Sequence, residues 1–398
     1  MSVWDEVVGQ PEAVRTLSAA VRAGADVLAG APTATGVRDS AMTHAWLFTG
    51  PPGSGRSVAA RAFAAALQCP RSGCGVCPQC HQVRAGTHAD VRLVVPEGLS
   101  IPVKQMRELV LRAAQSPSGG RWHLILISDA DRLTEGASNA LLNAIEAPPA
   151  RTVFLLCAPS THPDDVAVTI RSRCRVVSLR TPNADAIAAL LVSRDGIDEA
   201  MARWAARAAQ GHVGRARRLA RDEQARARRQ SVLALPRSLT GLGACFDAAE
   251  VLIQAVEDEA TALTQQLEVT EMAALKQALG AGGTGKGAAG AARGSAGQLK
   301  DLEKAQKSRR TRAQRDALDR ALVDLAAFYR DVLVWRLGAR VAPVHVDIPE
   351  VIGRAAQVWT PESVLRRLDS VLACQAAVEL NVKPRIAVEA MAISLREG

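Results

Sequence analysis

Short apolar runs alternate with helical patterns over the first 180 residues of the chain. The apolar runs predict the strands of a sheet, at residues 45–48, 90–95, 122–128, 152–157 and 175–179. Apolar side chains recur at helical spacing in the segments between them, at residues 58–67, 103–115 and 134–147. Strands that alternate with helices predict a doubly wound α/β domain over residues 1–180.

From Asn183 onward the strand patterns stop and only helical patterns continue. We expect a small helical lid domain over residues 181–235, with helices at residues 184–193, 198–210 and 213–229. Longer patterns predict an all-α domain over residues 236–398, with helical parts at residues 242–279, 299–337 and 361–395. Gly, Ala and Ser dominate residues 280–298, which indicates a flexible loop inside that domain.

A phosphate-binding loop lies between the first strand and the following helix. The segment Gly50–Ser57 fits the pattern G-x-x-x-x-G-K-[ST] except that Arg56 stands where the lysine is expected. Arginine keeps the charge but is longer and forked, so we expect ATP or ADP to bind without efficient hydrolysis. A glycine-rich turn without a ligand is the alternative. The candidate nucleotide-binding residues of the loop are Gly50, Gly53, Ser54, Gly55, Arg56 and Ser57.

Half of the eight cysteines fall in one short segment after this helix: Cys69, Cys74, Cys77 and Cys80. Thiolates at this spacing can surround a tetrahedral Zn²⁺ ion, and the glycines and Pro78 between them allow tight turns. A full set of four thiolates leaves no open position, which predicts a structural metal site. Two disulfides or a redox cluster are the alternatives.

Composition narrows the class of protein further. The chain has 48% hydrophobic but only 3% aromatic residues, which favours helices with an Ala, Leu and Val core. The net charge is +9, which permits nucleic acid or other polyanions as partners. No apolar run approaches the length of a membrane span, and the N-terminus lacks a signal-peptide core. We therefore expect a cytoplasmic protein without membrane contact.

Several motifs occur together in a characteristic order. They are Val8-Gly9-Gln10, the phosphate-binding loop, the four cysteines, Asn139–Leu142 with Pro148-Pro149, and Ser172-Arg173-Cys174. Up to about residue 230, the chain resembles the AAA+ subunits of the bacterial sliding-clamp loader. The resemblance implies an AAA+ P-loop domain with a zinc-binding insertion, a helical lid and a helical collar domain for oligomerisation.

Within that family the chain is more similar to the delta-prime type of DNA polymerase III than to the tau/gamma motor. Arg56 is one reason, and the length, which leaves no room for further C-terminal domains, is another. A third is the end of the strand at residues 122–128, where Ser128 and Asp129 stand in for the family's Asp-Glu pair. Arg56 and the Ser128-Asp129 pair both replace residues that the family uses for phosphoryl transfer, so we expect no intrinsic ATPase activity.

The resemblance also implies roles for individual residues and partners. Arg173 would act as an arginine finger on the ATP of a neighbouring subunit, unless it forms an ordinary ion pair. Lys104 and Arg107 would face primer-template DNA, although solvated charge is as good an interpretation. The implied partners are tau/gamma and delta subunits and the sliding clamp. An active tau/gamma-like ATPase and a non-replicative zinc-bearing adaptor are the alternative functions.

Overall fold

A computed structural model describes the chain except for residues 1, 31–40, 114–116, 120 and 280–287. The described residues form two compact units, Met1–Arg217 and Arg218–Gly398. The boundary between the units falls within the helices that we assigned to the lid. The division into three domains stays a prediction.

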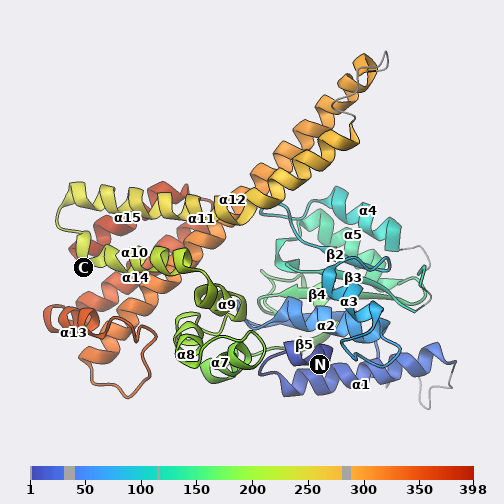
Figure 1. Cartoon of the computed structure of the whole chain (residues 1–398), viewed down its shortest axis with the longest axis horizontal. Coiled ribbons are helices and arrows are strands. Elements are labelled where there is room, and N and C mark those ends of the chain that lie inside the picture. Colours follow the sequence, from blue (N-terminus) through green and yellow to red (C-terminus); the bar gives the residue numbers. More distant parts are fainter. Residues whose placement is uncertain (1, 31–40, 114–116, 120, 280–287) are drawn as a thin grey trace. The chain divides into compact units, whose positions relative to one another are not determined.

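The first unit is built on a five-stranded parallel sheet with the order β2-β3-β4-β1-β5 (Figure 1). Each expected strand is present with its ends shifted by at most two residues. All side chains of β1 and β4 are buried, as the apolar runs predicted. The strands are β1 Ala45–Thr49, β2 Val91–Val94, β3 His123–Ile127, β4 Thr152–Ala158 and β5 Arg175–Ser178.

Helices cover both faces of the sheet because successive strand residues point to opposite sides. Trp46 and Phe48 belong to one core with Phe63, whereas Leu47 belongs to a second core with Met106. This arrangement confirms the α/β class. The helices of this part are η1 Val3–Glu6, α1 Pro11–Leu28, α2 Arg56–Gln68, α3 Pro78–Ala85, α4 Val103–Ala113, η2 Ala130–Arg132, α5 Glu135–Glu146 and α6 Val168–Arg171.

The helices after the sheet begin at polar caps. The side chains of Asn183 and Asp198 accept hydrogen bonds from the first turns of α7 Ala184–Ser193 and α8 Glu199–Ala208. We expected one helix over residues 213–229, which was wrong. The structure has α9 Val213–Arg221 and α10 Glu223–Ser238, because the Asp222 carboxylate accepts a hydrogen bond from Ala225 N at 3.2 Å and starts a new helix.

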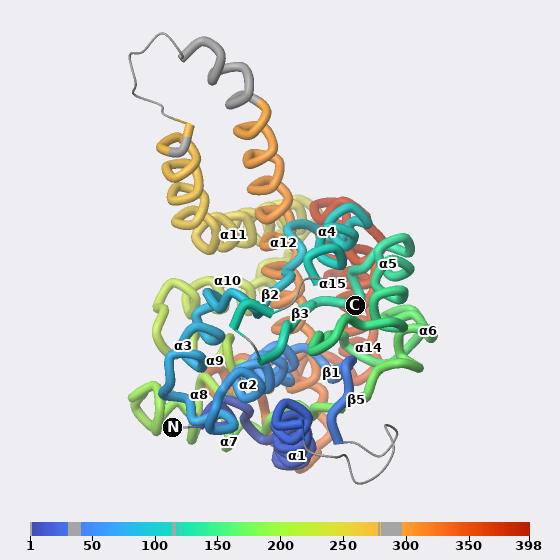
Figure 2. The backbone as a smooth tube through the Cα atoms, turned by 90° about the vertical axis from the view of Figure 1, so that its right-hand side faces the viewer, coloured from blue at the N-terminus to red at the C-terminus, as the bar shows by residue number. Residues whose placement is uncertain are grey.

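The second unit is entirely helical among the residues described, with a core of its own. Figures 1 and 2 show its two longest helices, α11 and α12, running side by side. The pattern at residues 361–395 forms two helices, since Pro384 starts a new one, and α13 was not expected. The bounds are α11 Leu242–Ala278, α12 Ala288–Arg336, α13 Pro349–Val358, α14 Pro361–Glu379 and α15 Pro384–Glu397.

The flexible loop expected over residues 280–298 differs from the structure. Helix α12 begins at Ala288, so residues 288–298 are helical, and residues 280–287 lie outside the described part. The alanines of this segment favour helix enough for α12 to extend through it. None of the described helices is long and apolar enough to cross a membrane.

Candidate functional site

The loop between β1 and α2 has the backbone geometry of a phosphate cradle. The φ angles are 153° at Gly50, 85° at Gly53 and 89° at Gly55, all in the region that favours glycine. The loop leads directly into the N-terminus of α2, where backbone N–H groups attract anions. A Cβ atom on Gly53 would lie 2.8 Å from Cα of His212, just before α9, so only glycine fits there.

Gln10 holds this loop in place from the N-terminal part of the chain. Its side-chain amide is buried and donates to the carbonyl of Ser54 at 3.3 Å. The same side chain accepts a hydrogen bond from Arg180 N at 3.1 Å and donates to Arg180 O at 2.5 Å. Gln10 thus joins the phosphate loop to the segment after β5. The sequence analysis noted Gln10 only as part of a motif.

Arg56 is turned back onto its own loop. Its guanidinium donates a hydrogen bond to the backbone carbonyl of Gly50. The lysine usual at this position reaches the β- and γ-phosphates, whereas this contact keeps Arg56 at the start of the loop. Ser54 is 2% exposed, and its hydroxyl lacks a hydrogen-bond partner among the residues that the structure describes. A buried, unpaired hydroxyl in a loop of this shape suits an anion.

The end of β3 supplies the acidic side chains near the loop. Ser128 is half-buried, and its backbone N–H donates to Val94 O at 3.0 Å. Burial raises the pKa of the nearby Asp131 carboxyl, the negative charge of Asp129 adds to this, and Arg56 opposes it. Asp131 was not among the expected site residues. It lies two positions after Asp129, and its approach to the loop depends on the turn of η2.

Behind the loop lies Cys157, from the centre of the sheet. Burial raises its pKa to about 12, and the hydroxyl of Ser57 forms a hydrogen bond with it. Ser57 is the residue that would bind Mg²⁺ in an active loop. The structure therefore brings Ser57 and Arg56 close to the acidic pair Asp129 and Asp131.

The four expected metal ligands meet in one cluster. Their sulfur atoms lie within 4.8 Å of one another, from Cys69, Cys74, Cys77 and Cys80. The Sγ atom of Cys69 is 3.6 Å from that of Cys74 and 3.7 Å from that of Cys77. A tetrahedral zinc with bonds of about 2.3 Å would place sulfurs about 3.8 Å apart, so the cluster fits such an ion.

Backbone groups around the cysteines favour thiolates. The N–H groups of Arg71 and Cys74 point at the Cys69 sulfur, at 3.3 and 3.4 Å. A hydrogen bond from the backbone of Val76 lowers the pKa of Cys74 to about 6. Gly73 has φ 102°, and its carbonyl accepts from Val3 N at 3.0 Å, which ties the cluster to the N-terminus. The described cluster can hold a metal ion.

Arg173 follows α6 at the surface of the first unit. Its guanidinium lies 2.5 Å from the Glu146 carboxylate, and it donates to Thr169 O at 2.9 Å and to the Ser172 hydroxyl at 3.2 Å. The side chains of Arg173 and Glu146 are 38% and 44% exposed. The ion pair is what the alternative interpretation of Arg173 anticipates, and the finger role stays a prediction.

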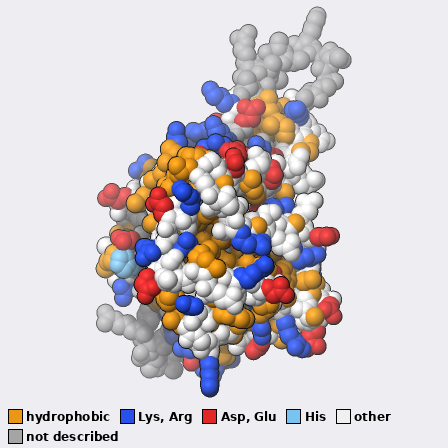
Figure 3. Space-filling model, turned by 90° about the vertical axis from the view of Figure 1, so that its left-hand side faces the viewer, with side chains coloured by type: hydrophobic (Ala, Val, Ile, Leu, Met, Phe, Trp, Pro, Cys, Tyr) orange, Lys and Arg blue, Asp and Glu red, His pale blue; other side chains and the backbone are white. Residues whose placement is uncertain are grey.

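The two candidate DNA-binding residues lie on the first turns of α4. Both Lys104 and Arg107 are exposed, whereas Met106 between them faces the core. Figure 3 shows basic side chains scattered among acidic and hydrophobic ones over one face of the molecule. Exposed basic side chains therefore also occur away from α4, and charge and exposure alone do not single out Lys104 and Arg107 as a nucleic acid surface.

Comparison with known proteins bears on the first unit. Residues 33–183 match the model of a family described as DNA polymerase III, delta subunit. The chain is 36% identical over 149 residues to DNA polymerase III subunit delta' of Pseudomonas aeruginosa, which covers 36% of this chain and 45% of that protein. It is 32% identical over 197 residues to subunit delta' of Bacillus subtilis, with coverage of 49% and 59%.

DNA polymerase III subunits of the tau and gamma/tau type match the chain as well. It is 32% identical over 173 residues to DNA polymerase III subunit gamma/tau of Mycobacterium tuberculosis, which covers 42% of this chain and 27% of that protein. The chain spans about half the length of the delta' relatives that it matches. Over residues 33–183 these findings confirm the expected resemblance to clamp-loader subunits of DNA polymerase III.

Proposed function

We propose that this protein is a clamp-loader subunit that binds nucleotide weakly or statically and supplies Arg173 to the ATP site of a neighbouring subunit. The observation that carries the proposal is the contrast between two sites. The nucleotide site departs from the family pattern at Arg56 in the loop and at Ser128 after β3, whereas Arg173 lies at the surface just after the short helix α6.

Two features weaken hydrolysis in the chain's own pocket. Arg56 is engaged by the Gly50 carbonyl and does not extend along the loop toward the phosphates. At the end of β3, Ser128 offers only a hydroxyl where the family's carboxylate would hold Mg²⁺. Nucleotide can still bind, because the glycines and the α2 N-terminus supply backbone donors that do not depend on these side chains.

Arg173 can reach the ATP of a neighbouring subunit by exchanging the Glu146 carboxylate for the γ-phosphate. Its ion pair with Glu146 is half-exposed, and such pairs are worth about 0–1 kcal/mol. A γ-phosphate carries more charge than a carboxylate and accepts a bidentate contact from a planar guanidinium. We infer that Glu146 pairs with the Arg173 guanidinium until a neighbouring subunit binds ATP, and that Arg173 then contacts the γ-phosphate instead.

The proposal includes partners and a metal. Tau/gamma and delta subunits would assemble with this chain in the cytoplasm to place a sliding clamp on primer-template DNA, which Lys104 and Arg107 would contact. Zn²⁺ would bind Cys69, Cys74, Cys77 and Cys80 and connect the end of α2 to α3. The ion's part is structural, since four thiolates complete its shell.

The test is ATP hydrolysis by the reconstituted loader carrying Arg173→Ala. We expect turnover at the neighbouring site to fall on the order of 10³-fold or more, because the guanidinium stabilises charge on the transferred phosphoryl group. Arg171→Ala is the matched control. It removes an exposed arginine two residues away, at the end of α6, and should leave turnover unchanged.

The purified chain separates this proposal from its rivals. Clear ATP hydrolysis by the chain alone, with or without DNA and clamp, would identify an active tau/gamma-like motor, a reading that the gamma/tau relatives also favour. Unchanged loader turnover in Arg173→Ala would exclude the finger and support an adaptor role.

A further inference from the structure

The hairpin of α11 and α12 extends past the other helices of the second unit as a two-helix arm (Figures 1 and 2). We define the arm as residues 261–278 of α11 and 297–316 of α12. The kind of residue that α11 buries changes where the arm begins. Before it, α11 buries apolar residues such as Ala249, Leu252 and Val256, whereas within it the buried residues are Thr264 and Glu268. The arm therefore has little apolar core.

Ion pairs hold the two helices of the arm together instead. Arg309 forms a bidentate pair with Glu271, at 2.9 and 3.0 Å, and Arg310 lies 2.6 Å from Glu268. Gln306 adds a hydrogen bond to Glu268 O at 3.1 Å. These contacts use both glutamates that α11 contributes to the arm.

A stripe of lysines on α12 is left without such partners. Lys300, Lys304 and Lys307 are exposed, and no carboxylate pairs with them among the described residues. Their spacing of four and three residues places them on one helix face. At 1.5 Å per residue the stripe is about 10 Å long, the length of about three phosphate steps along one strand of duplex DNA.

The charge balance of the arm agrees with this stripe. Residues 261–279 and 297–316 contain eight lysines and arginines and five aspartates and glutamates. The glutamates nearest the seam are neutralised by arginines, so the excess positive charge lies with the lysines. A solvated face is the ordinary role of surface lysines, and Asp301 and Glu303 lie within one turn of this stripe, but the stripe itself carries three positive charges and no negative one.

We propose that this arm binds the phosphate backbone of nucleic acid through Lys300, Lys304 and Lys307. The inference deepens the proposed function, on which it rests for the presence of DNA, by adding a contact on the all-helical unit. The arm's described segments contain no aromatic residue on which a base could stack. Recognition is thus electrostatic, without sequence preference, and duplex and single strands bind through the same chemistry.

The experiment measures binding of the purified full-length chain to a fluorescent 30-base-pair duplex and to its single strand, over a series of salt concentrations. The triple variant Lys300→Gln, Lys304→Gln, Lys307→Gln should lower the slope of log affinity against log salt by up to about 3, since each lost duplex phosphate contact removes about 0.9. The matched control is Arg340→Gln, Lys383→Gln, Arg396→Gln, which removes equal charge from exposed positions outside the arm.

An unchanged salt slope in the arm variant, or an equal loss in the control, overturns the proposal. Tighter lysine-dependent binding of poly-glutamate than of either DNA would also overturn it, because the arm would then fit an acidic protein. Circular dichroism checks that the triple variant keeps its helices. Loader assays are not used, so failure of the arm and failure of the finger at Arg173 are told apart.

Discussion

Contacts with residues further along the chain fix the position and the pKa of single side chains in this protein. The Asp331 carboxylate is buried in the second unit, where it accepts hydrogen bonds from Val344 N and His345 N at 2.8 Å and lies 3.1 Å from His345 Nδ1. Burial acts to raise its pKa, but these contacts outweigh burial and hold the pKa below its usual range. The carboxylate fixes the loop between α12 and α13.

Because the pKa of Asp331 is low in the folded chain, the stability of the second unit depends on pH. The unfolded chain takes up this proton near pH 4, before the folded chain does. The contribution of Asp331 is therefore complete above pH 4 and is lost as the pH falls below that value. Replacement by asparagine should cost about 3 kcal/mol at neutral pH.

Urea unfolding between pH 3 and pH 7 measures this effect. The stability of Asp331→Asn should fall less steeply below pH 4 than that of the unchanged chain. Some slope should remain, because the hydrogen bond from Ala225 N and the charges of Arg228 and Arg218 outweigh burial and lower the pKa of Asp222 in the same unit. Identical slopes in variant and unchanged chain would contradict the assigned role.

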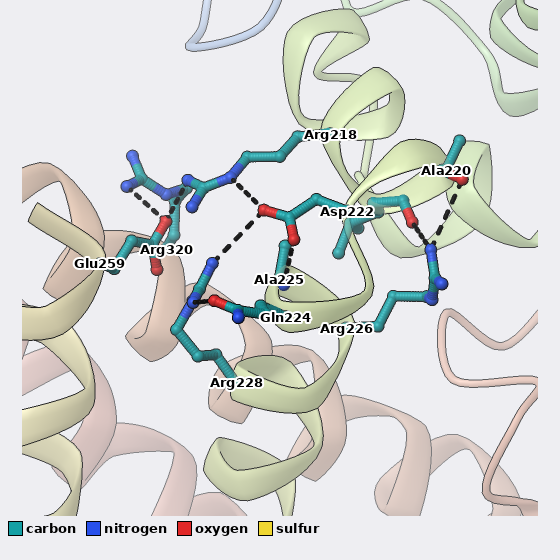
Figure 4. Close-up of polar contacts among 10 residues, drawn as sticks. Arg218, Ala220, Asp222, Gln224, Ala225, Arg226, Arg228, Glu259 and Arg320 are labelled. Atoms are coloured by element: carbon teal, nitrogen blue, oxygen red, sulfur yellow. Dashed lines mark hydrogen bonds and ion pairs between the residues drawn. The ribbon is translucent and has the colours of Figure 1, made fainter. Parts of the chain in front are cut away.

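At the scale of elements, local chemistry decides where helices end. Asp222 starts α10 by accepting from Ala225 N at 3.2 Å, and its carboxylate also lies 3.5 Å from Arg218 and 3.4 Å from Arg228 (Figure 4). Arg218 in turn lies 2.5 Å from Glu259 of α11. The cap and the ion pairs fix the break between α9 and α10.

The cap is expected to matter more than the ion pairs. Asp222→Ala should lower the free energy of unfolding of the second unit by about 1–2 kcal/mol, because the first turn of α10 loses its acceptor. Asp222→Asn keeps a side-chain oxygen and should cost less. Denaturant unfolding measures both, and equal losses would show instead that the ion pairs with Arg218 and Arg228 hold the break.

At the scale of the whole molecule, the two separate hydrophobic cores predict that the two units unfold in separate transitions. The four-cysteine cluster packs with the core around Phe63, whereas the second unit has its own core around Leu325. Chelation of the metal, or Cys77→Ser, should therefore lower the midpoint of one calorimetric transition and leave the other in place. Structural zinc sites contribute directly to folding energy.

Cysteine in the other unit provides the control for this experiment. Cys245 is fully buried in α11, away from the four ligands in sequence. Cys245→Ser should shift only the second transition, and its metal content should stay at about one zinc per chain. A fully folded chain without metal, or a Cys77→Ser chain with unchanged zinc, would refute the site.

The strands, most helices, the glycine-rich turn after β1 and the cysteine cluster could be predicted from the sequence alone. These features are encoded by neighbouring residues: a run such as residues 152–158 is apolar throughout, and Gly50 to Ser57 carry their signature within one turn. The helix break at Asp222 was missed because charged residues on both sides suit a helix as well as a cap.

The contacts of the site's side chains could not be predicted from the sequence, because they form between residues that only folding brings together. The pairing of Arg173 with Glu146, the turn of Arg56 onto Gly50 and the burial of Asp131 depend on packing that periodicity does not record. The polar seam of the arm likewise appears once Glu271 meets Arg309 across two helices. The local pattern of apolar and polar residues sets whether a segment is a helix or a strand. The direction of each site side chain and the charges around it arise only when distant elements pack together.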